Sequence, residues 1–319
     1  MARIGYHAAH EQLPPSRLLA DVRHAEEVGF QAGMCSDHLA PWSARQGESG
    51  NTWVWLGAAL QATSLSFGTV SAPGQRYHPA VHAQQVATAA ELAGPGRFWV
   101  ALGSGENLNE HVTGDQWPGK EERVARLLEC VDVLRALLAG DEVTHRGRIT
   151  VDRARVWSLP AEPPPLLAAA VSPESAATAS QWADGLITVN QPIDTLREVL
   201  DRYEGPGPRY LQVHVSWAED DEAALAIAHD QSRANVLGEP LAWDLPTPAH
   251  FDAACALVRP EDVRDAVLVS SDLGQHAAWL AERVALGFDA VYVHHVGKEQ
   301  ARFLDAFGDK VLPELRDAA

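Results

Sequence analysis

The feature that most constrains the fold is the repeated alternation of short apolar segments with longer helical segments. Eight short segments have the composition of buried strands, namely Arg3–Tyr6, Gln31–Cys35, Ser66–Thr69, Phe98–Ala101, Leu166–Ala170, Gly185–Val189, Leu211–Trp217 and Ala290–His294. Helical patterns separate most of them, clearest in Pro15–Val28, Pro79–Ala93, Lys120–Leu138, Pro173–Ala183, Glu222–Asn235 and Leu273–Leu286. Repeated strand-helix units predict a parallel sheet.

The ends of the helical segments support this interpretation. Glycine follows several helical patterns just before the next strand, as at Gly29, Gly94 and Gly287, and glycine suits the left-handed conformation that ends a helix. No Gly-, Ser- or Pro-rich linker divides the 319 residues into halves, and the proline run 161–165 resembles a rigid entry into the fifth strand. One closed (β/α)8 barrel, a TIM barrel of one domain spanning 1–319, is therefore the predicted α/β fold.

Charge and cysteine content exclude several classes of function. The net charge of −18 and the pI near 5.1 argue against binding to nucleic acid or to an anionic membrane surface. No apolar run reaches the roughly 18 residues of a membrane span, and the N-terminus lacks a signal-peptide pattern, so we expect a cytoplasmic protein. Three widely spaced cysteines, Cys35, Cys130 and Cys255, indicate reduced core thiols, and a catalytic Cys35 is the less favoured alternative.

Ionisable residues follow two of the predicted strands. Asp37 and His38 end the second strand, and Glu106 and Asn109 follow the fourth. The C-terminal ends of barrel strands meet on one face, so these groups are expected to share an active site. A histidine can exchange a proton near neutral pH, and a neighbouring aspartate can orient it or hold a cofactor atom. The alternative is a capping aspartate followed by a partly exposed histidine.

Glu106 lies between Gly105 and Asn107, where the backbone can approach a ligand closely. Its carboxylate could act as an acid, a base or a hydrogen-bond acceptor, or it could simply stabilise the N-terminus of a helix. The two roles are compatible. The preceding Gly103-Ser-Gly segment is not a G-x-G-x-x-G fingerprint, which disfavours a nicotinamide-binding fold.

The 14 histidines raise the question of a metal site. His294 and His295 are adjacent, but neighbouring residues on a strand point to opposite faces and make a poor chelating pair. No familiar ligand spacing occurs in the sequence, so no catalytic metal is expected. In the seventh strand, alternation predicts that Gln212, His214 and Ser216 line the barrel interior.

Three motifs, taken together, resemble the luciferase-like flavin and deazaflavin oxidoreductases, and in particular the branch similar to F420-dependent glucose-6-phosphate dehydrogenase. They are Ser36-Asp37-His38 with Pro41-Trp42, Gly68-Thr-Val-Ser71 followed by Arg76-Tyr-His-Pro-Ala80, and Gly103-Ser-Gly-Glu-Asn-Leu-Asn-Glu110. The similarity extends over nearly the whole chain. It implies a barrel with insertion segments at the C-terminal face, commonly a homodimer, that binds coenzyme F420 and acts on a small molecule.

The resemblance also implies roles for individual residues. His38 would take a hydroxyl proton, Trp42 would shield or stabilise the developing charge, and Glu106 would exchange a proton with the deazaflavin. A non-proline cis peptide at Val70–Ser71 would support the ring. The residues that the resemblance places against the cofactor are Asp37, Val70, Ser71, Gly105, Glu106, Asn109, Ala169 and Ala170.

The chain departs from the sugar-phosphate members of this branch where they carry basic residues for the phosphate. His214 stands in place of a lysine, and the segments 240–244 and 265–267 lack the other cations. A dianion requires charge-assisted hydrogen bonds, so glucose 6-phosphate is a poor candidate, and a neutral alcohol or carbonyl compound is expected. The expected substrate contacts are His214, Trp243 and His294.

Two alternatives stay open at this stage. The same barrel could bind reduced FMN and act as a monooxygenase, as other luciferase-like proteins do. It could also bind a deazaflavin without catalysis, although the presence of both His38 and Glu106 argues against that role. The motifs favour the F420-dependent oxidoreductase.

Overall fold

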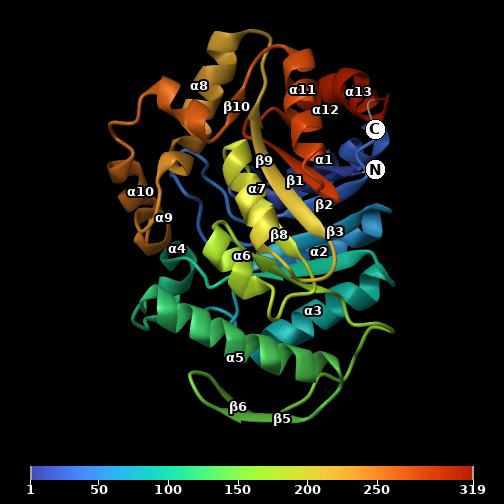
Figure 1. Cartoon of the computed structure of the whole chain (residues 1–319), viewed down its shortest axis with the longest axis vertical. Helices are drawn as coiled ribbons and strands as arrows, with labels where there is room; N and C mark the ends of the chain where they lie inside the picture. Colours follow the sequence, from blue (N-terminus) through green and yellow to red (C-terminus); the bar gives the residue numbers. More distant parts are fainter. Residues whose placement is uncertain (1, 318–319) are drawn as a thin grey trace.

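The computed structural model describes residues 2–317 and confirms the predicted barrel. Eight parallel strands pair in the order β11-β1-β2-β3-β4-β7-β8-β9, and β9 pairs with β11 to close the ring (Figure 1). The strands of the barrel are β1 (Arg3–Ala8), β2 (Ala32–Cys35), β3 (Ser66–Ser71), β4 (Phe98–Leu102), β7 (Leu166–Ala169), β8 (Leu186–Val189), β9 (Arg209–Ser216) and β11 (Ala290–His295). All eight predicted strands are thus confirmed, and the short β10 (Leu268–Val269) adds an edge to β9.

Helices cover the outside of the barrel, and three of them have the predicted bounds. These are α1 (Pro15–Val28), α3 (Pro79–Ala93) and α5 (Lys120–Leu138). The first begins at a proline and ends at Gly29, whose φ of 105° allows its N–H to donate to the carbonyls of the last turn. The remaining helices are α2 (Thr52–Ala62), α4 (Asn107–Glu110), α6 (Pro173–Ala179), α7 (Ile193–Arg202), α8 (Asp221–Ser232), α9 (Leu241–Asp244), α10 (Pro248–Ala254), α11 (Leu273–Val284), α12 (Gln300–Ala306) and α13 (Leu312–Asp317).

The sequence pattern did not predict α2 because this helix is apolar on nearly every side. A helix without a polar face gives no period of 3.6 residues to detect. Its start is nevertheless encoded locally, since the Asn51 side chain accepts a hydrogen bond from the Val54 N–H at 3.1 Å.

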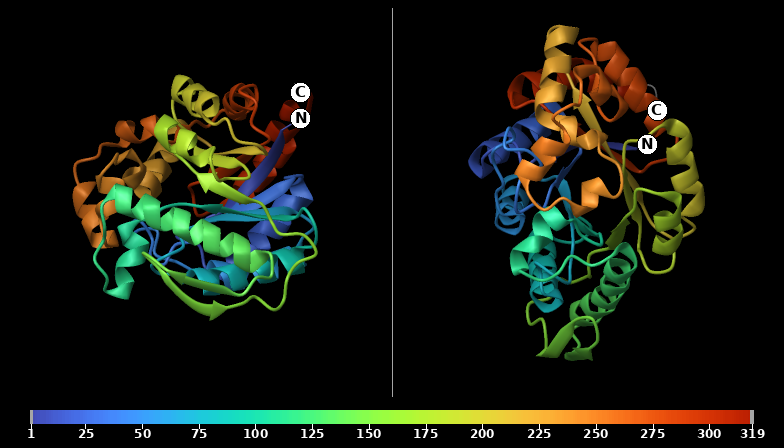
Figure 2. Two further views of the ribbon diagram at one scale, coloured as in Figure 1. Left: turned by 60° about the horizontal axis from the view of Figure 1, so that its bottom comes forward. Right: turned by 90° about the vertical axis from the view of Figure 1, so that its left-hand side faces the viewer.

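Two insertions interrupt the strand-helix alternation, and only one lies where it was expected. Helices α9 and α10 lie beside α4 at the C-terminal end of the barrel (Figure 1). The antiparallel hairpin of β5 (Val143–Arg146) and β6 (Thr150–Ala154) was not predicted and packs on the outer side of α5 and α3 (Figure 2). Its strands are largely exposed, so they lack the apolar pattern of the barrel strands.

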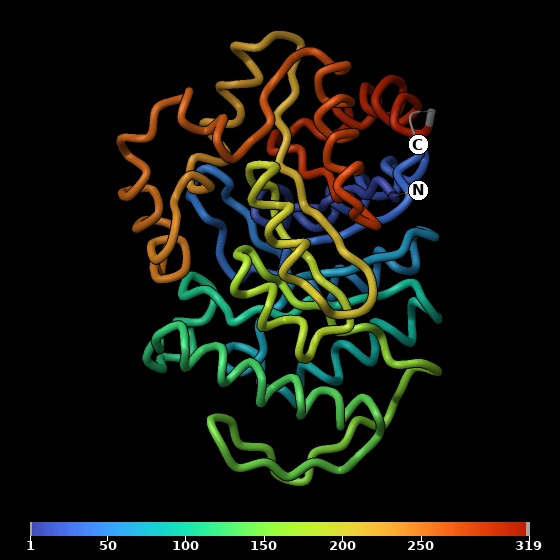
Figure 3. Tube along the Cα trace, in the orientation of Figure 1, coloured from blue at the N-terminus to red at the C-terminus, as the bar shows by residue number. Residues whose placement is uncertain are grey.

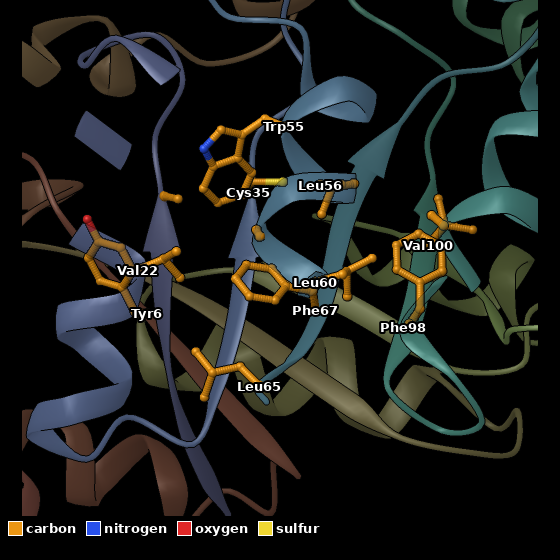
Figure 4. Close-up of a cluster of buried hydrophobic side chains, with 14 of the residues drawn as sticks. Tyr6, Val22, Cys35, Trp55, Leu56, Leu60, Leu65, Phe67, Phe98 and Val100 are labelled. Atoms are coloured by element: carbon orange, nitrogen blue, oxygen red, sulfur yellow. The ribbon is translucent and has the colours of Figure 1, made fainter. Parts of the chain in front are cut away.

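Alternate residues of the barrel strands enter two separate cores. Outward-facing side chains such as Tyr6 and Phe67 pack against α1 and α2, where Trp55 meets Phe67 at a ring-centroid distance of 5.9 Å (Figure 4). Inward-facing side chains fill the barrel, and the Trp99 indole N–H donates to the Tyr292 hydroxyl at 3.1 Å. The barrel is therefore a packed core below its C-terminal end.

The first strand lies beside the last helix in the Cα trace (Figure 3), and Ile4 and Leu315 line the same small hollow. The Arg316 guanidinium donates to the Gly29 carbonyl at 2.8 Å and ties α13 to the end of α1. Among residues 2–317 no helix is long and apolar enough to cross a membrane.

Gly68 tests the packing of the barrel interior. A Cβ atom at this position would overlap the buried Trp99 ring, whereas a Cβ at the exposed Gly238 would meet no atom within 4 Å. We expect Gly68→Ala to lower the free energy of unfolding by about 1–3 kcal/mol, the usual cost of overpacking. Gly238→Ala should change it by less than about 0.5 kcal/mol. Urea unfolding followed by circular dichroism measures both, and equal values would contradict the packing described here.

Candidate active site

The structure brings His38 and Glu106 together at the C-terminal end of the barrel, as predicted. His38 follows β2 and Glu106 follows β4. The Nε2 atom of His38 lies 3.7 Å from Glu106 Oε2, and both side chains are partly exposed, 16% and 20% respectively. A small molecule that reached this end of the barrel would therefore meet an imidazole and a carboxyl group side by side.

A second carboxylate, which the sequence analysis missed, lies on the other side of His38. Glu11 Oε1 is 3.4 Å from His38 Nδ1, and the Glu11 side chain is only 5% exposed. The Ser36 hydroxyl donates to Glu11 Oε2 at 2.8 Å and fixes this carboxylate. Glu11 directly follows the first strand region, so the reasoning applied to Asp37 and Glu106 could have found it. The His38 Nδ1 and Glu11 Oε1 atoms make no hydrogen bond at this distance, but the Glu11 carboxylate is close enough to pair with a protonated His38.

Glu106 does not use its side chain to cap the helix that follows it. It occupies the N-cap position of α4, but its side chain makes no capping hydrogen bond. The Asn109 amide group donates to Glu106 Oε2 at 3.3 Å, and the Asn109 carbonyl oxygen accepts from the Leu39 N–H at 2.9 Å. Burial raises the pKa of Glu106, and the nearby His38 opposes this shift in part. Glu106 is therefore easier to protonate than an ordinary glutamate.

Trp42 forms one wall beside His38. The two ring centroids are 5.2 Å apart, and Trp42 also packs edge-on against Phe251 of α10 at 5.0 Å. The Gln46 side-chain oxygen accepts a hydrogen bond from the backbone N–H of Trp42 at 2.9 Å. The insertion helices thus support the tryptophan from outside the barrel.

The buried Asp37 carboxylate already has partners within the protein. Its carboxylate accepts from the Ser71 hydroxyl at 2.6 Å and from the Tyr77 hydroxyl at 3.0 Å. The Arg76 guanidinium lies 3.4 Å from the same carboxylate, and the Asp37 side chain is 1% exposed. Both Asp37 and Ser71 were expected to contact a cofactor, and in this structure they contact each other.

Arg76 connects Asp37 to the segment that follows β4. The backbone N–H of Arg76 donates to Glu110 Oε2 at 2.6 Å, and its guanidinium lies 3.6 Å from Glu110 Oε1. Breaking a buried ion pair by removing one partner leaves an uncompensated charge. Arg76 therefore fixes the two strand ends that carry Asp37 and Glu106.

The expected cis peptide between Val70 and Ser71 is wrong. Among residues 2–317 the cis peptide bond lies instead at Glu239–Pro240. Val70 and Ser71 continue the regular pairing of β3 with β4, opposite Ala101 and Leu102. A trans bond continues this ladder without the cost of about 3 kcal/mol that a non-proline cis bond carries.

The remaining expected cofactor contacts fall on two sides of the barrel wall. Val70 and Ala169 face the interior, and Gly105 has a φ of 87°, a left-handed conformation that glycine adopts without strain. Ala170 packs outward against Ala176 of α6. Only the main chain of Ala170 is thus available to a bound molecule.

Three histidines form a layer across the barrel interior, and one of them was not predicted. His294 of β11 and His214 of β9 are directly paired, with ring centroids 4.8 Å apart. His7 of β1 stacks on the other side of His294 at 4.5 Å. We call His7, His214 and His294 the histidine layer. Gln212 lies beside it, with its amide group 3.3 Å from His214 Nε2.

Ser216 does not belong to this interior set, contrary to expectation. Its buried hydroxyl donates to the Ala224 carbonyl at 2.7 Å. Ser216 is the last residue of β9, where α8 packs over the strand end and offers an acceptor. The predicted opposite orientation of His295 is confirmed, because its ring stacks on Phe303 outside the barrel at 4.5 Å.

Trp243 lies on the insertion loop, and its indole N–H donates to Glu239 of that loop at 3.0 Å. Its neighbour Asp244 makes the contacts to the active-site segment. The Asp244 carbonyl accepts from the Asn107 amide at 2.9 Å, and its carboxylate accepts from the Trp117 indole at 2.9 Å. The structure thus docks this loop next to Glu106 without placing Trp243 against His38.

Cys35 is a core thiol, as favoured by the sequence. It is fully buried, and burial raises its pKa well above the ordinary value. A thiol in this state is not a nucleophile.

The pH dependence of stability should report on the histidine layer. Burial lowers the pKa of His214 from 6.5 to about 4. Between these values the unfolded chain binds the proton and the folded chain does not. The stability that depends on a neutral His214 is therefore fully present above pH 6.5. It is lost as the pH falls from 6.5 through the folded pKa of about 4. We expect the free energy of unfolding to fall less steeply between pH 7 and pH 4 in His214→Gln than in the wild type, as measured by denaturant titrations. Parallel curves would contradict this.

Comparisons with known proteins identify similar proteins over nearly the whole chain. The sequence profile of the family described as luciferase-like monooxygenase matches residues 1–290. A relative from Nakamurella multipartita, named F420-dependent glucose-6-phosphate dehydrogenase, is 34% identical and covers 98% of this chain and 96% of its own. Another from Mycobacterium tuberculosis, named F420-dependent hydroxymycolic acid dehydrogenase, is 33% identical over 98% of this chain and 88% of its own.

A solved structure is also similar over the full length. It is an F420-dependent secondary alcohol dehydrogenase in complex with an F420–acetone adduct, and it superposes with a TM-score of 0.89 at 27% identity. The match covers 99% of this chain and 100% of the other.

Proposed function

The chain belongs to the luciferase-like monooxygenase family, and we propose that it is a coenzyme F420-dependent oxidoreductase that transfers a hydride between the deazaflavin and an alcohol or carbonyl compound. The observation that carries this proposal is the position of His38 between Glu11 and Glu106 at the C-terminal end of the barrel. Relatives named as F420-dependent dehydrogenases support it over nearly the whole chain.

The residues at this end fit a planar ring with one polar edge. Val70 and Ala169 are partly exposed apolar side chains that can lie against a ring face. Gly105 leaves main-chain groups accessible, and Glu106 and Asn109 provide polar atoms beside them. When bound, coenzyme F420 supplies a ring carbon that accepts or returns a hydride.

His38 is the proposed base for the substrate hydroxyl. In the oxidation, a hydrogen leaves the substrate carbon with two electrons for the deazaflavin, and the hydroxyl proton passes to His38 Nε2. Glu11 at Nδ1 stabilises the imidazolium that forms. The reduction of a carbonyl compound reverses these transfers.

Glu106 is the proposed second proton-transfer group. Its raised pKa allows it to carry a proton nearer to neutral pH than an ordinary glutamate. Trp42, whose ring lies 5.2 Å from the His38 ring, is proposed to exclude water from the side of His38 that it covers. We also propose that the substrate is neutral and that glucose 6-phosphate is not turned over.

The cofactor and the base can be tested together. We expect reduced and oxidised F420 to quench the intrinsic tryptophan fluorescence, and FMN to bind much more weakly. His38→Ala should lower turnover roughly 10²- to 10⁴-fold, the usual contribution of a general acid-base group, while F420 affinity stays within a few-fold. His24→Ala is the matched control, because His24 lies on the outer helix α1, paired with Asp305.

Preferential binding of FMN would instead indicate a flavin monooxygenase. Unchanged turnover in His38→Ala would remove the proposed base, even if F420 binds. An equal loss in His24→Ala would show that the effect is not specific to the site.

We further propose that the protein is a homodimer formed through α2 and α3. These two helices pack side by side, and Val54 and Val81 on their outer surface are 77% and 51% exposed. Helix α2 carries no charged residue, and α3 carries only Glu91. Two copies with a net charge of −18 each repel one another, so an uncharged apolar surface suits their contact.

A charge placed on this surface should separate the copies. We expect Val81→Glu to shift the mass measured by light scattering from that of two chains to that of one. Leu257→Glu is the control, since Leu257 is 92% exposed outside α2 and α3. A wild-type protein that is monomeric at micromolar concentration would contradict the proposal.

We also propose that residues 1–319 act as one domain in the cytoplasm. The first barrel strand pairs with the last one, which makes the two ends of the chain structurally dependent on each other. All three cysteines are buried and free, a state that a reducing compartment maintains.

A further inference from the structure

We infer that the histidine layer is the floor of the substrate site and binds a neutral hydroxyl group at the end of the substrate remote from the reacting carbon. This inference rests on the proposed function and specifies its substrate class. The preferred substrate is then a secondary alcohol, or the matching ketone, that carries a second, uncharged hydroxyl group. The evidence is the position of the layer, its unpartnered nitrogen atoms and its lack of charge.

The layer lies directly above the packed part of the barrel. His294 is two residues beyond Tyr292, whose side chain fills the interior, so alternation points His294 to the same side. His214 is paired with His294 across the strands. Because His214 and Gln212 stay partly exposed, the layer can be reached from the C-terminal end.

Two members of the layer carry buried nitrogen atoms without a partner. The Nδ1 atoms of His7 and His294 make no hydrogen bond within the described chain, although these residues are only 4% and 8% exposed. A buried polar group without a partner is destabilising. A substrate hydroxyl that supplied the missing partner would recover part of this cost on binding.

The layer is built for an uncharged group. Burial lowers the pKa of all three histidines, to about 4 for His214 and well below the ordinary value for the other two. The His294 Nε2 atom is within 2.7 Å of the Gln12 side-chain oxygen, which belongs to a neutral amide. A neutral imidazole offers one donor and one acceptor, as a hydroxyl group does. A phosphate or carboxylate would need the positive charge that the layer lacks.

The loop that follows β1 links the histidine layer to His38, the proposed base. Glu11 lies against His38, and the next residue, Gln12, lies against His294. The Gln12 amide group also donates to the Gln231 side chain at 3.2 Å and so is fixed between β1 and α8. The base and the floor are therefore held at a constant separation by consecutive residues.

The test compares two substrates of the same size. Pentane-1,4-diol and hexan-2-ol share a secondary alcohol and the same number of heavy atoms, but only the diol ends in a hydroxyl group. We expect kcat/KM with F420 to favour the diol by about 10-fold, the value of one well-made hydrogen bond. A preference for hexan-2-ol, or equal values, would overturn the inference, as would efficient turnover of glucose 6-phosphate.

Variants locate the effect. His294→Leu removes one of the two unpartnered Nδ1 atoms and should reduce the ratio of kcat/KM for the diol to that for hexan-2-ol to near one. His295→Leu should keep the wild-type ratio, since His295 lies next to His294 but packs outside the barrel on Phe303. A ratio lost equally in both variants would overturn the assignment to the layer. The wild-type ratio tests the inference even if a variant fails to fold.

A second measurement does not depend on the cofactor. In the F420-free protein, pentane-1,4-diol should shift the imidazole nitrogen resonances of His7, His214 and His294 in NMR spectra, and hexan-2-ol should shift them less. Equal shifts, or none, would overturn the inference. Selective shifts with the diol, combined with no turnover of either alcohol, would support the floor and contradict the proposed function, so the two failures are distinguishable.

Discussion

The parallel pairing of β1 with β2 and β11 is the constraint on which the site depends. These pairings align His7 with Met34 on one side and Tyr6 with Val293 on the other. All three strands therefore end at the same height in the barrel. This places Glu11, His38 and the histidine layer at one end of it. Without this register the base would have no carboxylate at Nδ1 and the barrel no polar floor.

The site combines fixed charges with groups that stay neutral. Asp37 and Glu110 are buried around Arg76, so the positive charge nearest to the strand ends is already paired. Burial favours the neutral form of Glu106 and of the histidine layer. The chain therefore presents proton-transfer groups and uncharged hydrogen-bonding groups, rather than free cations, to a substrate. This arrangement is consistent with small neutral alcohols and ketones.

Much of the barrel could be predicted because its signals are local. The strand segments are short apolar runs, and α1 and α3 each begin at a proline and end at a glycine. The helix α2 gave no signal because it is apolar all round, and the hairpin β5–β6 gave none because it is largely exposed. For the site, the strand-end rule found His38 and Glu106, whereas Glu11 was overlooked because it follows the first strand after several alanines and histidines without a conspicuous motif.

The sequence by itself determined the fold class, the strand ends that carry chemistry and the opposite orientations of His294 and His295, because periodicity and local capping depend only on neighbouring residues. Only the tertiary structure decided that Glu11 lies beside His38, that Asp37 accepts hydrogen bonds from Ser71 and Tyr77, and that His7 joins His214 and His294. These are contacts between residues far apart in the chain. Their distances follow from the register and closure of the barrel, which no local pattern specifies.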